Sequence, residues 1–216
     1  GNTDWFNAGN WDGNVVPASS DDVLIDANVI VTATAAPVNF KSLALGGTAS
    51  TTLKLSIGTA FPGALIIKDK GTLEQNSDIE LSFSSVTVQQ GGKLAHTANG
   101  ATRLYSLKLN ITGNLDLQSG ATIYLDGLGY GGGYTSNGWG PGRGNYANNT
   151  GSGAGHGGAG GASNNFVGGI IYDSLTDPGD LGSGGGGGWY VAGGVGGGAL
   201  IAVIGLILFQ EIMTGM

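Results

Sequence analysis

The acidic residues of the sequence are the first place to look for catalysis. Asp78 and Glu80 stand two residues apart, so their carboxylates would share one face if this segment formed a β-strand. Two carboxylates on one face can supply the acid and the nucleophile or base of a glycosidase. Because no aromatic cleft and no separate base candidate accompany them, we expect no catalytic residue, and a polysaccharide-degrading enzyme is kept only as the second alternative.

Side chains that hold metals are scarce. Cysteine is absent, and His96 and His156 are the two histidines, neither with a second metal-binding residue nearby in sequence. Asp173, Asp177 and Asp180 could offer the oxygen ligands that Ca²⁺ prefers. However, the repeated aspartates of a calcium-binding Gly-Gly-x-Gly-x-Asp nonapeptide are missing. We therefore expect these aspartates to shape turns and expect no cofactor or metal, with Ca²⁺ as the alternative.

Motifs and charge argue against several other chemistries. The sequence contains no Gly-x-Ser-x-Gly elbow and no His-Glu-x-x-His motif. Its Gly-x-Gly patterns do not lead from a strand into a helix, and no Gly-Lys-Ser/Thr follows them, so no nucleotide site is predicted. A net charge of −7, with only 8 Lys and Arg residues, provides no basic stripe for nucleic acid.

Aromatic residues are the remaining candidates for binding chemistry. Four of them lie in the glycine-rich part of the chain: Trp139, Tyr146, Trp189 and Tyr190. Such residues either contact a ligand, for instance a glycan, or fill gaps between closely packed backbones. Both interpretations stay open at this stage.

The elements that position these residues follow from an internal repeat. Segments 64–67, 85–88 and 106–109 are alike and recur with a 21-residue spacing, and a looser copy, 42–45, precedes them with a 22-residue spacing. The same 21-residue spacing relates 71–73, 92–94 and 113–115, and also Phe83, Leu104 and Leu125. Three columns in one register are therefore predicted to stack.

Apolar residues alternate within each copy, as in Leu65 and Ile67, which is the period of a β-strand. One short unit cannot bury its inner face alone, but stacked units enclose a continuous core. We therefore predict an all-β fold, a right-handed parallel β-helix (solenoid) of about 21 residues per coil with a long glycine-rich loop insertion. A β-sandwich is the rival fold, although it would not require the repeat.

The N-terminal residues follow the pattern D-W-x-x-x-x-N-W-x-x-x-x-V-P-x-x-x-D-D-V-x-I, from Asp4 to Ile25. This pattern resembles the opening of β-solenoid segments in large secreted and cell-surface bacterial proteins, where it precedes stacked coils. Independently of that resemblance, the open end of a solenoid needs a cap. We expect Trp5, Phe6 and Trp11 to close the core there.

The stretch 127–198 differs in character, since it contains two-thirds of the chain's 45 glycines. A flexible linker is one interpretation. Regularly placed aromatic residues favour a second, in which glycine-rich loops or extended polyglycine-type strands pack closely. The runs around His156 and at 196–201 are similar to glycine-rich regions of bacterial surface solenoids and of some phage tail-fibre proteins.

The apolar run 199–209 is too short for a transmembrane helix, which needs about 20 residues. We predict two buried strands, 200–204 and 206–209, with 212–216 beginning another coil. A solenoid ending on such a coil would present an adhesive edge. The predicted assembly edge consists of Leu200, Ile201, Val203, Leu206, Leu208 and Phe209.

These inferences give four regions: a cap and first strands (1–34), coils (35–126), the glycine-rich insertion (127–198) and a hydrophobic terminal coil (199–216). We expect a non-catalytic, extracellular or cell-surface structural protein that assembles through stacked coils into a fibre. Its partners would be identical subunits or further coils of the same protein. The first alternative is an adhesin or a receptor- or glycan-binding module of a surface or tail-fibre protein.

Overall fold

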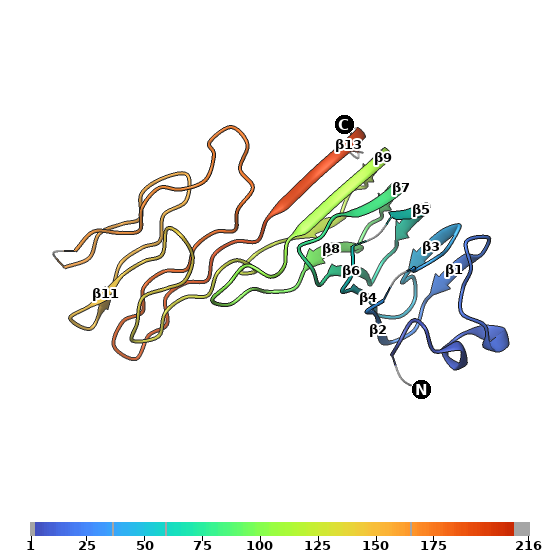
Figure 1. Ribbon diagram of the computed structural model, residues 1–216, viewed down its shortest axis with the longest axis horizontal. Coiled ribbons are helices and arrows are strands. Elements are labelled where there is room, and N and C mark those ends of the chain that lie inside the picture. The colour runs from blue at the N-terminus through green and yellow to red at the C-terminus, as the bar shows by residue number, and fades with distance from the viewer. Residues whose placement is uncertain (1–2, 36, 59, 165, 210–216) are drawn as a thin grey trace, which may run out of the picture. The chain divides into compact units, whose positions relative to one another are not determined.

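The computed structural model describes residues 3–35, 37–58, 60–164 and 166–209 (Figure 1). The chain forms two compact units. We call the first the β-sheet unit, made of Gly1–Ala95, Lys108–Tyr124 and Ala202–Met216. We call the second the glycine-rich unit, made of His96–Leu107 and Leu125–Ile201.

Two parallel sheets form the β-sheet unit, and successive strands of the chain alternate between them from β1 to β10. Across the six-stranded sheet the order is β1 (Asp22–Ile25), β3 (Ser42–Leu45), β5 (Ala60–Ile67), β7 (Leu81–Val88), β9 (Leu107–Leu117) and β13 (Leu200–Phe209). Across the five-stranded sheet it is β10 (Thr122–Tyr124), β8 (Lys93–His96), β6 (Gly71–Gln75), β4 (Thr51–Leu55) and β2 (Val29–Ala33). The expected all-β, parallel character is confirmed.

The predicted register holds in the first copies of the repeat. Ser42 pairs with Ala64 between β3 and β5, and Ala64 pairs with Ser85 between β5 and β7. These pairings join the residues that the repeat aligns in the sequence. The alternating residues Leu65 and Ile67 are fully buried, so the inner face is also as expected.

The third copy of the repeat was predicted wrongly. Val86 pairs with Leu115 rather than with Leu107, and Leu81 pairs with Leu109. In the other sheet, Lys93 pairs with Thr122 instead of segment 113–115, which lies in β9. The cause is the segment 97–106, which leaves the sheet and lengthens this repeat; Leu104, expected in the core, is consequently exposed.

Aromatic rings stack inside the β-sheet unit, one from each successive copy. Phe61 lies between Phe40 and Phe83, with ring centroids 5.6 Å and 5.0 Å away and nearly parallel planes. Trp5, which is fully buried, adds to the same row beside Phe40. Each such pair contributes about 0.5–1.5 kcal/mol beyond the burial of its apolar area.

The N-terminal residues form two 3₁₀ turns, η1 (Ala8–Asn10) and η2 (Asp12–Asn14), over the start of the sheets. Asp4 forms a parallel β-bridge with Thr32 of β2, and the Trp5 amide donates to the Thr32 carbonyl oxygen at 2.8 Å. The Trp11 indole stands edge-on to Trp5 and donates to its carbonyl oxygen. The turns are thus tied to the buried tryptophan.

The glycine-rich unit consists mainly of extended segments outside regular strands, apart from the short pair β11 (Tyr146–Ala147) and β12 (Thr150–Gly151) (Figure 1). Segment 182–187 lies among the others, and its successive residues bond in different directions. Gly182 donates to Gly197, Gly184 to Trp139 and Gly186 to Ser152, all at 2.9–3.0 Å. A β-strand bonds to two neighbours in one plane, whereas bonding in several directions is typical of extended helices with three residues per turn.

Close backbone approach explains the glycine content of this unit. A Cβ atom on Gly184 would lie 1.9 Å from the Gly131 carbonyl oxygen, and one on Gly186 would lie 2.0 Å from that of Asn145. Side chains therefore cannot fill this interior. Its buried hydrophobic cluster is small, comprising Tyr130, Leu181 and Ala199.

The hydrophobic end of the chain forms one continuous strand, β13, beside β9. The prediction of two strands divided at Gly205 was wrong. A Cβ on Gly205 would lie 2.7 Å from the Thr112 carbonyl oxygen, so this glycine lets β9 approach and does not end the strand. Residues 212–216 lie outside the described part. Among the described residues, no helix has the length and apolarity needed to cross a membrane.

Candidate ligand-binding surface

Three turns of the glycine-rich unit bring exposed aromatic and amide side chains together. They comprise residues 134–137, 146–150 and 188–191, and we call them the turn surface. Asn148 and Asn149 form the turn between β11 and β12, and Trp189 and Tyr190 form the turn closed by the bridge between Gly188 and Val191. Tyr134 is joined to the chain beyond that turn by a bridge to Ala192.

Two backbone hydrogen bonds and one to the Asn137 side chain join the three turns. The Trp189 amide donates to the Asn149 carbonyl oxygen at 2.9 Å. The Gly187 amide donates to the Ser136 carbonyl oxygen at 2.9 Å. Asn137 Oδ1 accepts from the Tyr146 amide at 2.7 Å. The turns are therefore one connected surface rather than three independent loops.

Left-handed backbone conformations concentrate on this surface. Thr135, Asn148, Asn149 and Tyr190 have φ values of 47°, 49°, 64° and 59°. Asparagine tolerates this region, but a threonine or tyrosine held there costs of order 1–3 kcal/mol. Such residues persist where the surrounding structure determines them, and they cluster at binding and catalytic sites. Here the hydrogen-bonded glycine segments supply the constraint.

The side chains of the turn surface are uncharged, and apart from Ala147 and Val191 they are aromatic or polar. Trp189 is 56% exposed and Tyr190 is 76% exposed, and their ring centroids lie 5.6 Å apart at an angle of 44°. Tyr134 is also exposed. The Tyr146 hydroxyl donates to Asn149 Oδ1 at 3.1 Å, which orients that amide.

The structure brings together three of the four aromatic residues singled out from the sequence. Tyr146, Trp189 and Tyr190 belong to the turn surface, but Trp139 does not. Trp139 is exposed on an extended segment, where its backbone bonds to Gly131 and Gly184. Sequence reasoning did not single out Tyr134 or the Asn148–Asn149 pair as site residues, although two asparagines before Thr-Gly are a recognisable turn signal.

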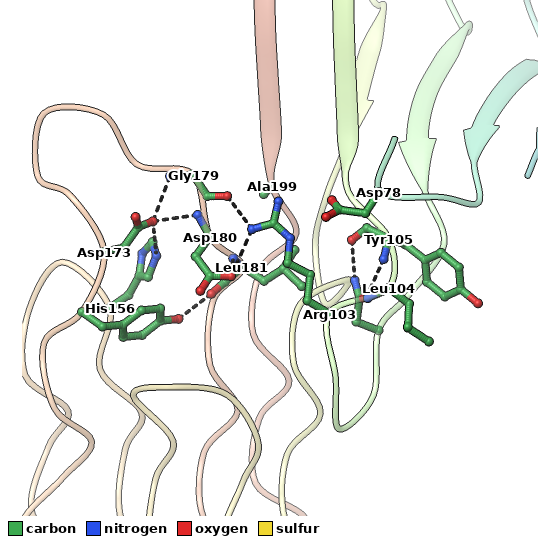
Figure 2. Close-up of polar contacts among 12 residues, drawn as sticks. Asp78, Arg103, Leu104, Tyr105, His156, Asp173, Gly179, Asp180, Leu181 and Ala199 are labelled. Carbon is green, nitrogen blue, oxygen red and sulfur yellow. Dashed lines mark hydrogen bonds and ion pairs between the residues drawn. The ribbon is translucent and has the colours of Figure 1, made fainter. Parts of the chain in front are cut away.

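A charged network holds another part of the glycine-rich unit together (Figure 2). Arg103 Nη1 donates to the Gly179 carbonyl oxygen at 2.7 Å and lies 3.3 Å from Asp180 Oδ1. Asp173 Oδ2 accepts from the amides of Gly179 and Asp180 and lies 3.3 Å from His156 Nε2. The amides of Asp180 and Ser174 hold the pKa of the Asp173 carboxyl below its usual value.

This network includes Asp173 and Asp180, two of the three aspartates considered as Ca²⁺ ligands. The oxygens of Asp173 face backbone amides, and Asp180 Oδ1 accepts from the Leu181 amide and faces Arg103. Within the described ranges, no group of three or more His, Cys, Asp or Glu residues could hold a metal ion. The Tyr172 hydroxyl donates to the Leu181 carbonyl oxygen, and burial raises the pKa of Tyr172, which keeps that donor protonated. The cluster joins two loops of the unit.

Asp78 and Glu80 do not form the carboxylate pair considered for a glycosidase. Both precede β7 and lie outside any strand, so the condition for a shared face is not met. Asp78 Oδ1 lies 3.1 Å from Lys108 Nζ. Glu80 Oε1 accepts from Asn110 Nδ2 at 3.1 Å. Both carboxylates thus serve contacts within the β-sheet unit.

An open groove of about 770 Å³ lies in the β-sheet unit, between the N-terminal turns and β1. Five aspartates line it: Asp4, Asp12, Asp21, Asp22 and Asp26. Hydrogen bonds from Ser42 and Lys41 lower the pKa of Asp22, and the amides of Ala49 and Thr48 lower that of Asp26. Asp22 is thus bonded to the start of β3, and Asp26 to the loop before β4, so these two carboxylates serve contacts within the β-sheet unit.

The predicted assembly edge falls on β13, at the end of the six-stranded sheet. Val203 is 64% exposed, Leu200 is also exposed and Ile201 is half-buried. The side chains of Leu206, Leu208 and Phe209 lie outside the described residues. In the described part of the chain, no further strand pairs with the outer edge of β13.

Comparison with known proteins adds no relative, because no family model, curated protein or solved structure matches the chain.

Proposed function

We propose that this protein is a non-catalytic, extracellular structural protein whose glycine-rich unit binds a cell-surface or matrix ligand through the turn surface. It would act as an adhesin-type module. The observation that carries the proposal is the exposure of Trp189 and Tyr190 on turns that are bonded to one another and hold left-handed residues. Aromatic residues on a preorganised surface are the usual anchors of binding energy.

The proposal includes a right-handed parallel β-solenoid as the scaffold. Three observations of the β-sheet unit support that architecture: strands alternate between two parallel sheets, paired residues recur every 20–22 residues from β1 to β7, and aromatic rings stack from copy to copy. Stacked repeats of this kind form an extended support. That property suits display of a binding surface.

The composition of the turn surface supports a binding role over simple packing. Tyr and Trp provide large contact areas that lose little entropy on binding, while Ser, Asn and Gly provide adaptable hydrogen bonds, as in antibody binding loops. Packing would require the rings to be buried, yet Trp189, Tyr190 and Tyr134 are all exposed. We infer that their partner is another molecule.

A pair of tryptophan variants tests this proposal. The full chain and its Trp189→Ala and Trp139→Ala variants would be incubated with intact microbial cells and with insoluble polysaccharides, and the bound protein quantified. Trp139 is a matched control, because it is 49% exposed but lies off the turn surface. We expect Trp189→Ala to weaken binding by about tenfold or more and Trp139→Ala to bind as the wild type does. Equal binding by all three proteins would refute the proposal.

Assembly is a second candidate function, favoured by the exposed apolar edge strand β13. Its unpaired backbone groups could accept a parallel strand from an identical subunit or from a further coil. Filaments of the purified chain should then be visible by electron microscopy and should disappear in Val203→Lys. Val195→Lys is the control, because Val195 is 51% exposed in the glycine-rich unit. Filaments that survive Val203→Lys would exclude β13 as the contact.

A further inference from the structure

We infer that the ligand of the turn surface is a neutral oligosaccharide, such as a short stretch of an uncharged polysaccharide. This inference rests on the proposed function, because it names the chemical class that the same surface would recognise. Four properties of the surface lead to it: charge, hydrogen-bonding capacity, the arrangement of its rings and its size.

Charge is the first property. The segments 134–137, 146–150 and 188–191 contain no Lys, Arg, Asp, Glu or His. A phosphate or sulfate group on a ligand would be desolvated there without an opposite charge, which is unfavourable. The nearest charged residue along the chain is Arg143, three residues before the second turn. The surface therefore favours a neutral ligand.

Hydrogen-bonding capacity is the second property. Asn148 and Asn149 are exposed, and an amide side chain both donates and accepts hydrogen bonds. The hydroxyl groups of Ser136, Thr150 and Tyr190 also do both. Sugar hydroxyl groups have this same dual character, so a ring with several of them can be satisfied by this set. A purely apolar ligand would desolvate these groups without offering them new hydrogen bonds, which is unfavourable.

The aromatic rings are the third property. A sugar ring has an apolar face of C–H groups that packs on an aromatic face, while its hydroxyl groups point outward. Trp189 and Tyr190 offer two such faces, inclined at 44° with centroids 5.6 Å apart. Rings inclined in this way can contact one sugar from two sides or two sugars in succession. The polar groups lie on the neighbouring turn at Asn149, which is bonded to the Trp189 amide.

Size is the fourth property and separates a saccharide from a protein partner. A stable protein interface uses about 20–30 residues on each side. The turn surface offers far fewer, since it consists of three short turns. A small rigid surface suits a small ligand, because little entropy is lost in ordering it. Repeated copies of a polysaccharide unit would then raise the effective affinity.

The experiment measures binding of the full chain to soluble neutral polysaccharides (dextran, mannan, xyloglucan and galactan), to dextran sulfate, and to phosphatidylcholine vesicles. Each is tested with the wild type, Trp189→Ala, Trp139→Ala and Arg143→Ala. We expect binding to at least one neutral polysaccharide, weakened about tenfold or more by Trp189→Ala and unchanged by Trp139→Ala and Arg143→Ala. Circular dichroism of each variant checks that it is folded.

Binding to cells treated with periodate or with protease distinguishes failure of the neutral-saccharide inference from failure of the proposed function. Binding that needs Trp189 and is abolished by periodate, which cleaves sugar diols, supports the inference. Three outcomes would overturn the neutral saccharide but leave the proposed function standing. They are Trp189-dependent binding that protease abolishes, binding to dextran sulfate through Arg143, and binding to vesicles. No binding to any neutral polysaccharide also overturns the inference. If no surface is bound in a Trp189-dependent way, the proposed function fails with it.

Discussion

The interiors of the two units of this protein are filled by different parts of the polypeptide. In the β-sheet unit, side chains fill the interior, and apolar residues alternate inward along strands such as β4 and β7. In the glycine-rich unit, backbones occupy the interior and bond to one another in several directions, around a hydrophobic cluster of three residues. The stability of the first unit depends on the burial of apolar side chains, and the stability of the second depends on close approach of backbone segments.

Because of this difference, the two units tolerate substitutions at different kinds of position. An inward position of the β-sheet unit tolerates another apolar residue of similar volume. A contact glycine in the other unit tolerates no side chain, whereas its turns accept any residue that the backbone conformation allows. A binding surface built on such turns can diversify without altering the frame.

Removing an aromatic ring from the stack should produce the largest loss of stability. Phe61 is 1% exposed and lies between two other phenylalanines. Phe61→Ala should destabilise the β-sheet unit by about 3–5 kcal/mol, because it removes contacts and leaves a cavity. Denaturant unfolding measures the change. Phe61→Leu, which keeps most of the volume, should cost less, and equal losses for the two variants would contradict the role assigned to the stack.

Adding a single methyl group should disrupt the glycine-rich unit. In Gly184→Ala the new Cβ would lie 1.9 Å from the Gly131 carbonyl oxygen, which belongs to the backbone and cannot rotate away. We expect a loss of about 2–3 kcal/mol, seen as faster amide hydrogen exchange in segment 182–187. Gly194→Ala is the control, because no atom lies within 4 Å of its added Cβ. That variant should change stability by less than about 0.5 kcal/mol.

The contrast also explains how much of the fold could be predicted. In the β-sheet unit the inward side chains repeat with the coil, so residues 42–45, 64–67 and 85–88 were aligned correctly. The alignment failed at β9 because Leu104 continues the apolar pattern within segment 97–106, which leaves the sheet before β9 begins at Leu107. The periodicity of apolar residues indicates which side chains face inward, but it does not indicate where a loop is inserted.

The candidate site was predictable only by residue type. Trp189, Tyr190 and Tyr146 stood out as aromatic residues in a glycine-rich background, but so did Trp139, which lies elsewhere. The segments that join the three turns are linked by glycine backbone hydrogen bonds, which leave no pattern of side chains in the sequence. Which turns meet therefore became visible only from the fold.

Lowering the pH should weaken the charged network of the glycine-rich unit. The amides of Asp180 and Ser174 depress the pKa of Asp173, and His156 is an ionisable group that faces it. A carboxyl with a depressed pKa stabilises the folded state fully above its unfolded pKa of about 3.9 and loses that contribution as the pH falls through the folded value. Asp173→Asn should therefore loosen loop 174–180 at neutral pH, and its difference from the wild type should shrink as the pH falls through the folded pKa of Asp173.

Hydrogen exchange of loop 174–180 across this range measures the effect. Asp177→Asn is the matched control, because in the described part of the chain the Asp177 carboxylate has no hydrogen bond. It should leave exchange unchanged at every pH. A difference between Asp173→Asn and the wild type that persists undiminished at the lowest pH would show that the charge is not what stabilises the loop.

The last prediction separates stability from binding at a single residue. Tyr190 has a φ of 59°, a conformation that glycine adopts without strain. Tyr190→Gly should therefore stabilise the turn by about 1 kcal/mol while weakening ligand binding by removing an exposed ring. Thermal unfolding and the polysaccharide assay measure the two effects. Tyr190→Phe keeps both the ring and the strain, so it should retain much of the binding and gain no stability. A stabilised Tyr190→Gly that still bound as the wild type does would mean that the strained tyrosine serves something other than the ligand.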